Sequence, residues 1–464
     1  MSATLDKNKQ KQMILNDNLW SVMLKLSWPA VVAMVLYGLN TVFDAIFVGR
    51  FVGESALAGV SLAYPLTQLS LGVGSLIGVG AGSALSIAIG AEDIKTQKRL
   101  LGNANYLSIV TGIIFMIIGL IFSTSLVRMM GGRGEELILG NEYFRVTLYG
   151  SIFWIAGLAG NMIVRAEGKM KSAAVMMGSG LIVNIIANYI LIVLLGFGVE
   201  GAAWGTNIGM VVYTLSSLIY FSKGRATFDA RPFSINRDKA IVKDIFSMGI
   251  PSLIMTVMTL LQAIVVLNAI SNYGTTFDVA FYGVVYRIFT FLLTPIFGLM
   301  RALQPVIGIN FGAQKNDRVI SSFKIFAVAS SLIMFPFWLI NMIAPQFALN
   351  LMMPSNVFDA SSIMNFRIFM ILLPVLPIIF MSMTFFPAIN NGKPASIMGI
   401  SRQLLFYVPV MLIFPRLYGI KWVYIGSFLI DSIIILWVFI IVKREFNILR
   451  GNRTQLKPNI ENAS

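Results

Sequence analysis

Two carboxylates stand inside apolar runs of the sequence, where a charge is costly. Asp44 lies in "LNTVFDAIFVG" (39–49), and Asp431 lies near the middle of the run 422–442. A charged Asp at the centre of a membrane helix costs about 2.5–3.5 kcal/mol on insertion scales, so each is a candidate functional group. The depth of the residue within its apolar run favours Asp431 as the functional acid, because Asp44 is only about 6 Å from the end of its run at 1.5 Å per residue. Structural roles remain open for both: an interfacial acid near Arg50 for Asp44, and a helix-pairing contact for Asp431.

Amides and hydroxyls accompany Asp44 at helical spacing. Two of them precede it by four and three residues, which puts all three side chains on one helix face. Two asparagines four residues apart share a face of a later apolar run, and a threonine follows in the next run. These candidate partners for binding a proton or cation with Asp44 are Asn40, Thr41, Asn184, Asn188 and Thr206. Each of them alone is also typical of an ordinary interhelical hydrogen bond.

Six polar residues within apolar runs, Asp431 among them, are candidates to line a substrate cavity. Arg301 is the most informative, because it can pair with Asp431, line the cavity, or favour anionic or zwitterionic substrates. The candidates are Tyr37, Asn161, Gln262, Arg287, Arg301 and Asp431.

The chain contains no His and no Cys. Their absence removes the usual proton carrier at neutral pH, as well as disulfides and Cys metal sites. Burial of a carboxylate in a medium of low dielectric raises its pKa, so a buried acid can exchange a proton near neutral pH. Neutral and anionic carboxyls make different hydrogen bonds, which gives the surrounding helix two shapes. We expect no metal site and no cofactor other than a proton or cation bound at Asp44. We also expect no enzyme activity, because no nucleophile–base set is visible.

The composition indicates a membrane protein. Of 464 residues, 57% are hydrophobic and 12% are charged, against about 25% charged residues in a typical globular domain. The net charge of +15 is spread over short loops, so we expect no nucleic-acid partner. The N-terminus lacks the apolar core and cleavage site of a signal peptide.

Twelve apolar runs are long enough to cross a hydrocarbon layer about 30 Å thick. Their approximate cores are 26–48, 57–89, 104–127, 143–164, 173–195, 201–222, 246–271, 279–310, 322–344, 363–388, 396–415 and 422–442. With the N-terminus inside, the inner loops and tails carry 26 Lys and Arg residues and the outer ones carry 7. Because inner loops are enriched in Lys and Arg, this bias predicts that both termini are cytoplasmic.

The two halves of the sequence resemble each other. Pro29 corresponds to Pro251, Gly90 to Gly312 and Arg145 to Arg367, each pair 222 residues apart. With six spans in each half, the repeats run parallel, related by an axis along the membrane normal. We therefore expect an all-α polytopic membrane protein of two pseudo-symmetric six-helix lobes around a central cavity, an architecture suited to alternating access.

The expected domains follow from these runs. They are a cytoplasmic tail (1–19), an N-lobe (20–222), a cytoplasmic loop between the lobes (223–244), a C-lobe (245–442) and a second cytoplasmic tail (443–464). A twelve-helix channel or a structural scaffold remains an alternative.

Several motifs resemble one known family. "LWSVMLKLSWPAVVAMVL" with "DAIFVGR", "RAEGKMKSA", "VNIIANYILIVLLGFGVEGAAWGT" and "LQPVIGINFGAQKNDRV" are similar to the multidrug and toxic compound extrusion (MATE) family, in its bacterial DinF- and MepA-like branch. The resemblance covers essentially the whole chain. It implies twelve helices in two lobes and antiport of a drug-like compound against protons or sodium ions.

The same resemblance implies roles for particular residues. The Asp before "IFVG" binds the cation or proton in this branch, which is Asp44 here. The fifth-helix motif normally ends in Asp, whereas Asn188 stands at that position, and the second lobe offers Gln262 where the sodium-coupled branch has acids. With one carboxylate, a sodium site loses half its charge while a protonatable Asp44 still works. We therefore favour proton coupling, with Asp44 acting alone.

The expected function is multidrug or toxin export across the cell membrane, the plasma or inner membrane, by a multi-pass monomer. The expected substrate is an amphipathic small molecule, and the other partner is the lipid bilayer. Sodium-coupled export and flipping of a lipid-linked precursor or polysaccharide are the alternatives. A flippase predicts a strongly basic cavity, for which Arg287 and Arg301 give partial support.

Overall fold

The computed structural model describes residues 2–353 and 358–456. Within this part of the chain all regular structure is helical, and no strand occurs. The expected all-α class is therefore confirmed. In lipid, an α-helix satisfies its own backbone hydrogen bonds, which is why such an apolar chain folds this way.

Nine helical runs among the described residues are long and apolar enough to span a membrane. They are α2 (Leu19–Phe51), α3 (Glu54–Gly90), α4 (Ile94–Met129), α7 with η1 (Met170–Asn188, Tyr189–Leu194), α9 (Lys239–Tyr273), α10 (Thr276–Gly312), α11 (Asn316–Ile343), α15 with η2 and α16 (Lys393–Ile400, Ser401–Tyr407, Val408–Tyr418) and α17 (Lys421–Leu456). A tenth is a pair bent by 56°, α5 (Gly134–Tyr149) and α6 (Ser151–Ala166).

The two remaining expected spans are also helical, although they fall outside that length and apolarity test. They are α8 (Gly198–Ser222) and the broken helix α13–α14 (Ala360–Met370, Pro377–Ala388). The break at 371–376 contains Pro374 and precedes Pro377, and proline removes a helix hydrogen bond. A short helix, α12 (Pro345–Met352), lies between α11 and α13. Each of the twelve expected spans thus coincides with helix.

Polar caps mark where several helices begin. The side chain of Asn18 accepts hydrogen bonds from the first backbone N–H groups of α2, and Asp93 does the same for α4. Thr275 and Asp278 form a reciprocal capping box at the start of α10. Such caps satisfy backbone donors that have no partner inside the helix.

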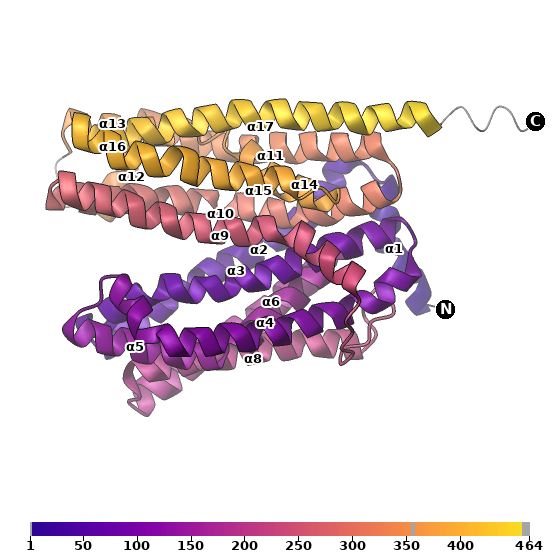
Figure 1. The fold of residues 1–464 in the computed structure, drawn as a ribbon, viewed down its shortest axis with the longest axis horizontal. Helices are drawn as coiled ribbons and strands as arrows, with labels where there is room; N and C mark the ends of the chain where they lie inside the picture. Colours follow the sequence, from indigo (N-terminus) through magenta and orange to yellow (C-terminus); the bar gives the residue numbers. More distant parts are fainter. Residues whose placement is uncertain (1, 354–357, 457–464) are drawn as a thin grey trace, which may run out of the picture.

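The helices form two bundles that diverge from one end (Figure 1). We call α2–α8 the N-lobe and α9–α17 the C-lobe; residues 223–238 join them without regular structure. Helix α9 begins at Lys239, six residues before the expected start of the C-lobe. The lobes meet where α3 packs against α9 and α10, and where α2 packs against α10.

Two glycines pack reciprocally between the lobes. A Cβ atom on Gly90 of α3 would collide with the carbonyl oxygen of Ile309, and one on Gly312 of α10 would collide with that of Ile87. Gly90 and Gly312 are 222 residues apart, as are Ile87 and Ile309, so the two contacts are equivalent with the roles of the two helices exchanged. Such reciprocal contacts are typical of an interface across a twofold axis. This geometry agrees with the duplication predicted from the motifs.

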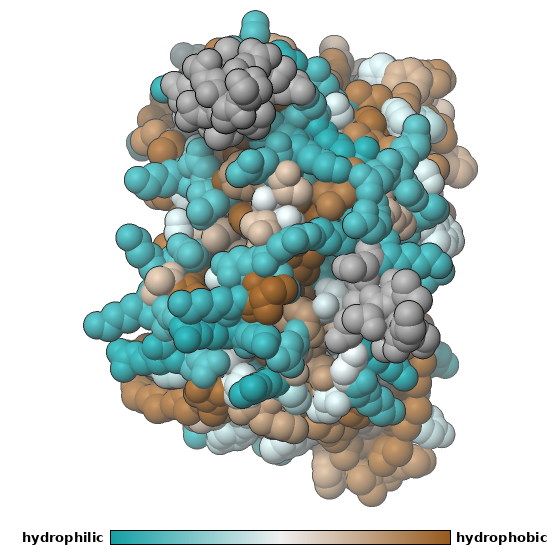
Figure 2. All heavy atoms as spheres, turned by 90° about the vertical axis from the view of Figure 1, so that its right-hand side faces the viewer, coloured by the Kyte–Doolittle hydropathy of each residue, from teal (hydrophilic) through white to brown (hydrophobic). Residues whose placement is uncertain are grey.

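The end of the molecule that carries α1 (Ser2–Asn16) and the end of α17 is the end where the lobes meet (Figure 1). Figure 2 views this end, and hydrophilic side chains cover most of it, with apolar ones along its flanks. The glycine contacts between lobes span Gly72 to Gly90 of α3. The lobes are therefore closed toward the termini and separate toward the opposite end.

Within the segment expected to be a cytoplasmic tail, residues Ser2–Asn16 form a helix that docks on the bundles. In α1, Gln10 donates to the carbonyl of Gly168 in the N-lobe at 2.8 Å, and Lys11 pairs with Glu92 at 2.7 Å. On the C-lobe side, Arg318 Nη2 donates to the carbonyl of Ile14 at 2.9 Å. Helix α1 thus bridges both lobes. The second expected tail, 443–464, is helical to Leu456, and its last eight residues lie outside the described part.

Candidate functional site

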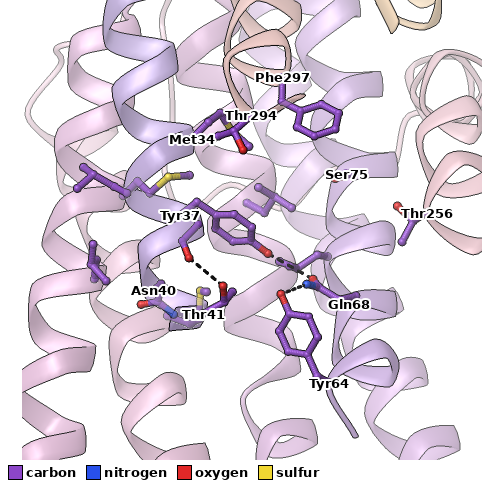
Figure 3. Close-up of a pocket in the computed structure, with 18 of the residues that line it drawn as sticks. Met34, Tyr37, Asn40, Thr41, Tyr64, Gln68, Ser75, Thr256, Thr294 and Phe297 are labelled. Carbon is purple, nitrogen blue, oxygen red and sulfur yellow. Dashed lines mark hydrogen bonds between the residues drawn. The ribbon is translucent and has the colours of Figure 1, made fainter. Parts of the chain in front are cut away.

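A cavity of about 700 Å³ lies between the lobes. Five N-lobe helices (α2, α3, α6, α7, α8) and two C-lobe helices (α9, α10) contribute its walls. Apolar and aromatic side chains dominate the lining, and hydroxyl and amide groups are interspersed. In Figure 3, Tyr37 of α2 donates to Gln68 of α3 at 3.3 Å, and Gln68 donates to Tyr64. Tyr37, one of the cavity candidates, therefore lines this cavity.

Several of the predicted partners of Asp44 lie around it. Asn188 Nδ2 donates to Asp44 Oδ1 at 2.6 Å, and Asn40 Nδ2 donates to Asp44 Oδ2 at 3.2 Å. Asn40 is one helical turn before Asp44 on α2, whereas Asn188 is the last residue of α7. Both carboxylate oxygens accept from neutral amides, and Asp44 has no ion pair among the described residues.

Asn184 also hydrogen-bonds to these residues when its amide group is turned so that both its nitrogen and its oxygen have partners. Its nitrogen then donates to Asp44 Oδ1 at 3.2 Å and to Asn40 Oδ1 at 3.0 Å. Its oxygen accepts from the backbone N–H of Thr206 at 3.2 Å, which brings α8 into the site. Because amide orientation is assigned from hydrogen bonding, the orientation that satisfies both ends is the one to adopt. We call Asp44, Asn40, Asn184, Asn188 and Thr206 the N-lobe polar network.

The N-lobe polar network reaches the cavity through its amides. Asn40, Asn184 and Thr206 line the cavity, whereas Asp44 and Asn188 lie behind them. A change in the hydrogen bonds of Asp44 therefore acts on the cavity wall directly. Thr41 also lines the cavity, but its hydroxyl donates to the carbonyl of Gly38 at 2.8 Å rather than to Asp44.

Asp431 belongs to a separate polar centre in the C-lobe. Its Oδ1 accepts from Arg402 Nε at 2.8 Å, and Arg402 also lies 5.0 Å from the ring centroid of Tyr407. Gln262 accepts from Gln403 Nε2 at 2.7 Å and lies 3.5 Å from Arg402 Nη1. We call Asp431, Arg402, Gln262 and Gln403 the C-lobe ion-pair cluster.

The two polar centres occupy corresponding helices. The N-lobe polar network uses α2, α7 and α8, and the C-lobe ion-pair cluster uses α9, η2 and α17, the equivalent helices of the second repeat. Gln262 stands 222 residues after Asn40. Their chemistry differs, because the acid of the C-lobe is neutralised by Arg402 while the acid of the N-lobe is held by amides alone.

The other cavity candidates do not all line the cavity. Arg301 lines the cavity and lies 3.8 Å from the sulfur of Met162, so it does not pair with Asp431. Arg287 is exposed on the surface of α10 and does not line the cavity. Asn161 is buried and donates to the carbonyl of Ala173 at 2.9 Å, which ties α6 to α7. Neither Gln262 nor Asp431 lines this cavity.

Two arginines, one buried and one partly buried, were not among the predicted site residues. Arg165, 3% exposed, lines the cavity from the end of α6, and Arg402 lies inside η2. Both were counted with the cations of inner loops. Arg402 lies six residues inside the expected span 396–415, so the rule that flags an intramembrane charge was sufficient to find it.

The profile of the MatE family matches residues 29–190 and 251–413. These two segments cover most of the chain, and their starting residues are 222 apart, the shift expected from the motifs. The chain belongs to the MatE family. The predicted resemblance is confirmed, and membership of this family of transporters agrees with the expectation that the chain is not an enzyme.

Curated MatE relatives include export proteins of staphylococci. The multidrug export protein MepA of Staphylococcus haemolyticus is 27% identical over 416 residues, which is 89% of this chain and 91% of that protein. The multidrug export protein MepA of Staphylococcus aureus strain MRSA252 is 26% identical over 444 residues, 94% of this chain and 96% of that protein.

Solved structures of MatE-like transporters share the fold. A MATE transporter in a bent conformation has a TM-score of 0.89 at 26% identity, over 96% of this chain and 99% of that one. An outward-facing multidrug resistance MATE transporter has a TM-score of 0.88 at 27% identity, over 95% and 98%. A MOP superfamily transporter from Pyrococcus furiosus, described as having a binding pocket of reversed polarity, has a TM-score of 0.87 at 27% identity, over 95% and 99%.

Proposed function

We propose that the protein exports amphipathic small molecules in exchange for protons, with Asp44 as the coupling carboxylate. The observation that carries the proposal is the N-lobe polar network: one carboxylate, held only by neutral amides that also form the cavity wall. The names of the staphylococcal relatives support export of small molecules.

The donors around Asp44 favour a proton over sodium. Hard cations bind to several oxygen ligands, whereas both oxygens of Asp44 already accept N–H groups. No group of three or more acidic, His or Cys side chains suitable for a metal ion occurs among the described residues. A proton needs only one lone pair of the carboxylate.

Protonation would change the contacts between two helices. An anionic Asp44 accepts from Asn188 of α7 and from Asn40 of α2. A protonated carboxyl becomes a donor at one oxygen, and that oxygen becomes a weaker acceptor for the amide that donates to it. The helices then repack, and Asn40 and Asn184 move with the cavity wall. Substrate release by alternating access follows from this rearrangement.

The Lys and Arg bias of the loops supports cytoplasmic termini in the plasma or inner membrane. With that orientation, the conformation described here has its cavity closed toward the cytoplasm and open outward. The likeness to an outward-facing transporter supports the same assignment.

The test is transport by the purified protein in vesicles with a pH gradient or a sodium gradient imposed separately. We expect accumulation of a fluorescent dye with the pH gradient alone, and its loss in Asp44→Asn. Glu54→Gln is the matched control, because Glu54 is an exposed acid at the same end of the N-lobe. Transport driven only by sodium would refute the coupling ion, and an active Asp44→Asn would refute the role of Asp44.

A further inference from the structure

Among the residues that the structure describes, the cavity lining includes two arginines and no acid. Of its described lining residues, only Arg165 and Arg301 carry a charge. Arg165 comes from α6 of the N-lobe, and Arg301 comes from α10 of the C-lobe. The two cations therefore face one space from opposite lobes.

Neither guanidinium is neutralised within the described part of the chain. Arg165 Nη2 is buried and has no hydrogen-bond partner. Arg301, which is partly buried, has only the sulfur of Met162, at 3.8 Å, as a partner among the described residues. Glu167 is close in sequence, but its carboxylate accepts from Tyr220 and Thr227 instead. A buried charge without a counter-charge is costly, so these cations create a demand for an anion.

The position of the arginines also suits an anionic end group. Next to Arg301, Gln304 donates to the carbonyl of Val79 and to Ser83 Oγ, both at 3.1 Å, where the two lobes are packed together. Arg301 and Arg165 thus lie at the closed end of the cavity. The planar fork of a guanidinium matches a carboxylate, sulfonate or phosphate oxygen pair.

The rest of the cavity accepts an apolar body. Tyr37, Tyr286 and Phe297 line it with several Met side chains. Aromatic and Met side chains adapt to flat, apolar molecules of different shapes. The dimensions agree, since small-molecule sites typically enclose about 300–1,000 Å³.

We propose that the substrate is an amphipathic anion whose carboxylate, sulfonate or phosphate binds between Arg165 and Arg301. Such a substrate contacts both lobes at once and offsets the repulsion between the two guanidiniums. It thereby links cavity occupancy to the closed arrangement of the lobes. This inference rests on the proposed transport function, and it specifies the charge of what is transported.

Binding in detergent tests the inference without any gradient. Fluorescein and rhodamine 123 share a flat xanthene body, but the first is an anion and the second a cation near pH 7.5. We expect fluorescein to bind at least about tenfold more tightly, and Arg301→Gln or Arg165→Gln to weaken it by about 10- to 100-fold, the range for a lost charge-assisted hydrogen bond. Arg301→Lys keeps the charge and retains part of the affinity.

Arg287→Gln is the matched control, because Arg287 lies on the same helix as Arg301 but outside the cavity. Its fluorescein affinity should equal that of the unaltered protein. Tighter binding of rhodamine 123, or unchanged fluorescein affinity in both cavity variants, would overturn the proposal. If a cavity variant does not fold, as judged by size exclusion, the preference of the unaltered protein for fluorescein over rhodamine 123 decides whether the cavity binds anions.

Two further measurements are needed. One distinguishes failure of the transport function from failure of the anion site, and the other distinguishes a lipid anion from a soluble one. If no gradient moves any dye, the transport function fails, while the binding preference still reports on the cavity. Phosphatidylglycerol added to the detergent tests a lipid source of the anion. Competition with fluorescein assigns the site to anionic lipid, and the absence of competition assigns it to soluble anions; both outcomes support an anion site.

Discussion

At the scale of single residues, Asn188 is the position at which the proposed proton coupling can be tested. Its amide donates to Asp44 at 2.6 Å, and the family motif has an acid at this position. Asn188→Asp would set two carboxylates within hydrogen-bonding distance. Like charges this close cannot both ionise unless they share a proton or bind a cation.

We therefore expect Asn188→Asp to respond to sodium. Dye transport in vesicles should gain stimulation by a sodium gradient of about two-fold or more, which we expect to be absent in the unaltered protein. Asn161→Asp is the control, because Asn161 is a buried amide of the same lobe that does not contact Asp44. A variant that remains insensitive to sodium would contradict the idea that the missing acid fixes the coupling ion.

The sequence predicts this network because helical spacing governs it. Asn40 and Asp44 are four residues apart, as are Asn184 and Asn188, and a helix brings such pairs to one face. Arg165 was missed because a cation just past the end of an apolar run resembles a loop residue, whereas Arg402 lies inside an expected span and could have been found there. The docking of α1 could not be predicted either, since its partners, including Gly168 and Arg318, are distant in sequence.

At the scale of helices, the Arg402–Asp431 pair fixes η2 against α17. Arg402 Nε is 2.8 Å from Asp431 Oδ1, and both side chains are largely buried. Removing one partner leaves a buried charge uncompensated, which typically costs about 3–5 kcal/mol, whereas replacing both can be neutral. We expect Asp431→Asn to lower the Tm in detergent and the double variant Arg402→Met with Asp431→Leu to restore most of it. Equal losses in single and double variants would argue that the pair is not coupled.

Glu167 ties the loop between the lobes to the N-lobe. Its carboxylate accepts from Tyr220 at 2.7 Å and from Thr227 Oγ1 at 2.7 Å, and Thr227 lies in the segment 223–238. Burial raises the pKa of Glu167, although these donors oppose the shift. At the exposed edge the reverse holds for Glu92, because its hydrogen bond to Lys11 lowers its pKa.

The raised pKa of Glu167 makes stability depend on pH. Above the ordinary value of 4.5, the folded protein retains a proton that the unfolded chain has lost, so the folded state binds more protons. Lowering the pH from neutral toward 4.5 should therefore stabilise the folded protein. We expect the Tm of the unaltered protein to rise relative to Glu167→Gln over this interval. A constant difference between the two would mean that Glu167 is ionised throughout.

At the scale of the whole molecule, the two lobes are held by contacts that a single methyl group can block. Gly312 packs against the backbone carbonyl of Ile87, and Gly90 packs against that of Ile309. Backbone cannot rotate away as a side chain can, so a Cβ atom here must separate α3 from α10. Under the proposed alternating access, separation at this end is the required motion, because the described residues close the cavity between the lobes here.

We therefore expect Gly312→Ala to shift the conformational equilibrium away from the state described here. The chain has no Cys, so spin labels can be attached at introduced cysteines: Lys95 with Lys324 near the termini, and Glu135 with Lys421 at the opposite end. The distance distribution of the first pair should lengthen and that of the second should shorten. Gly283→Ala is the control, because no atom lies within 4 Å of its added Cβ on the same helix α10. Unchanged distances in Gly312→Ala, or the same change in Gly283→Ala, would show that the reciprocal glycine contact does not control closure.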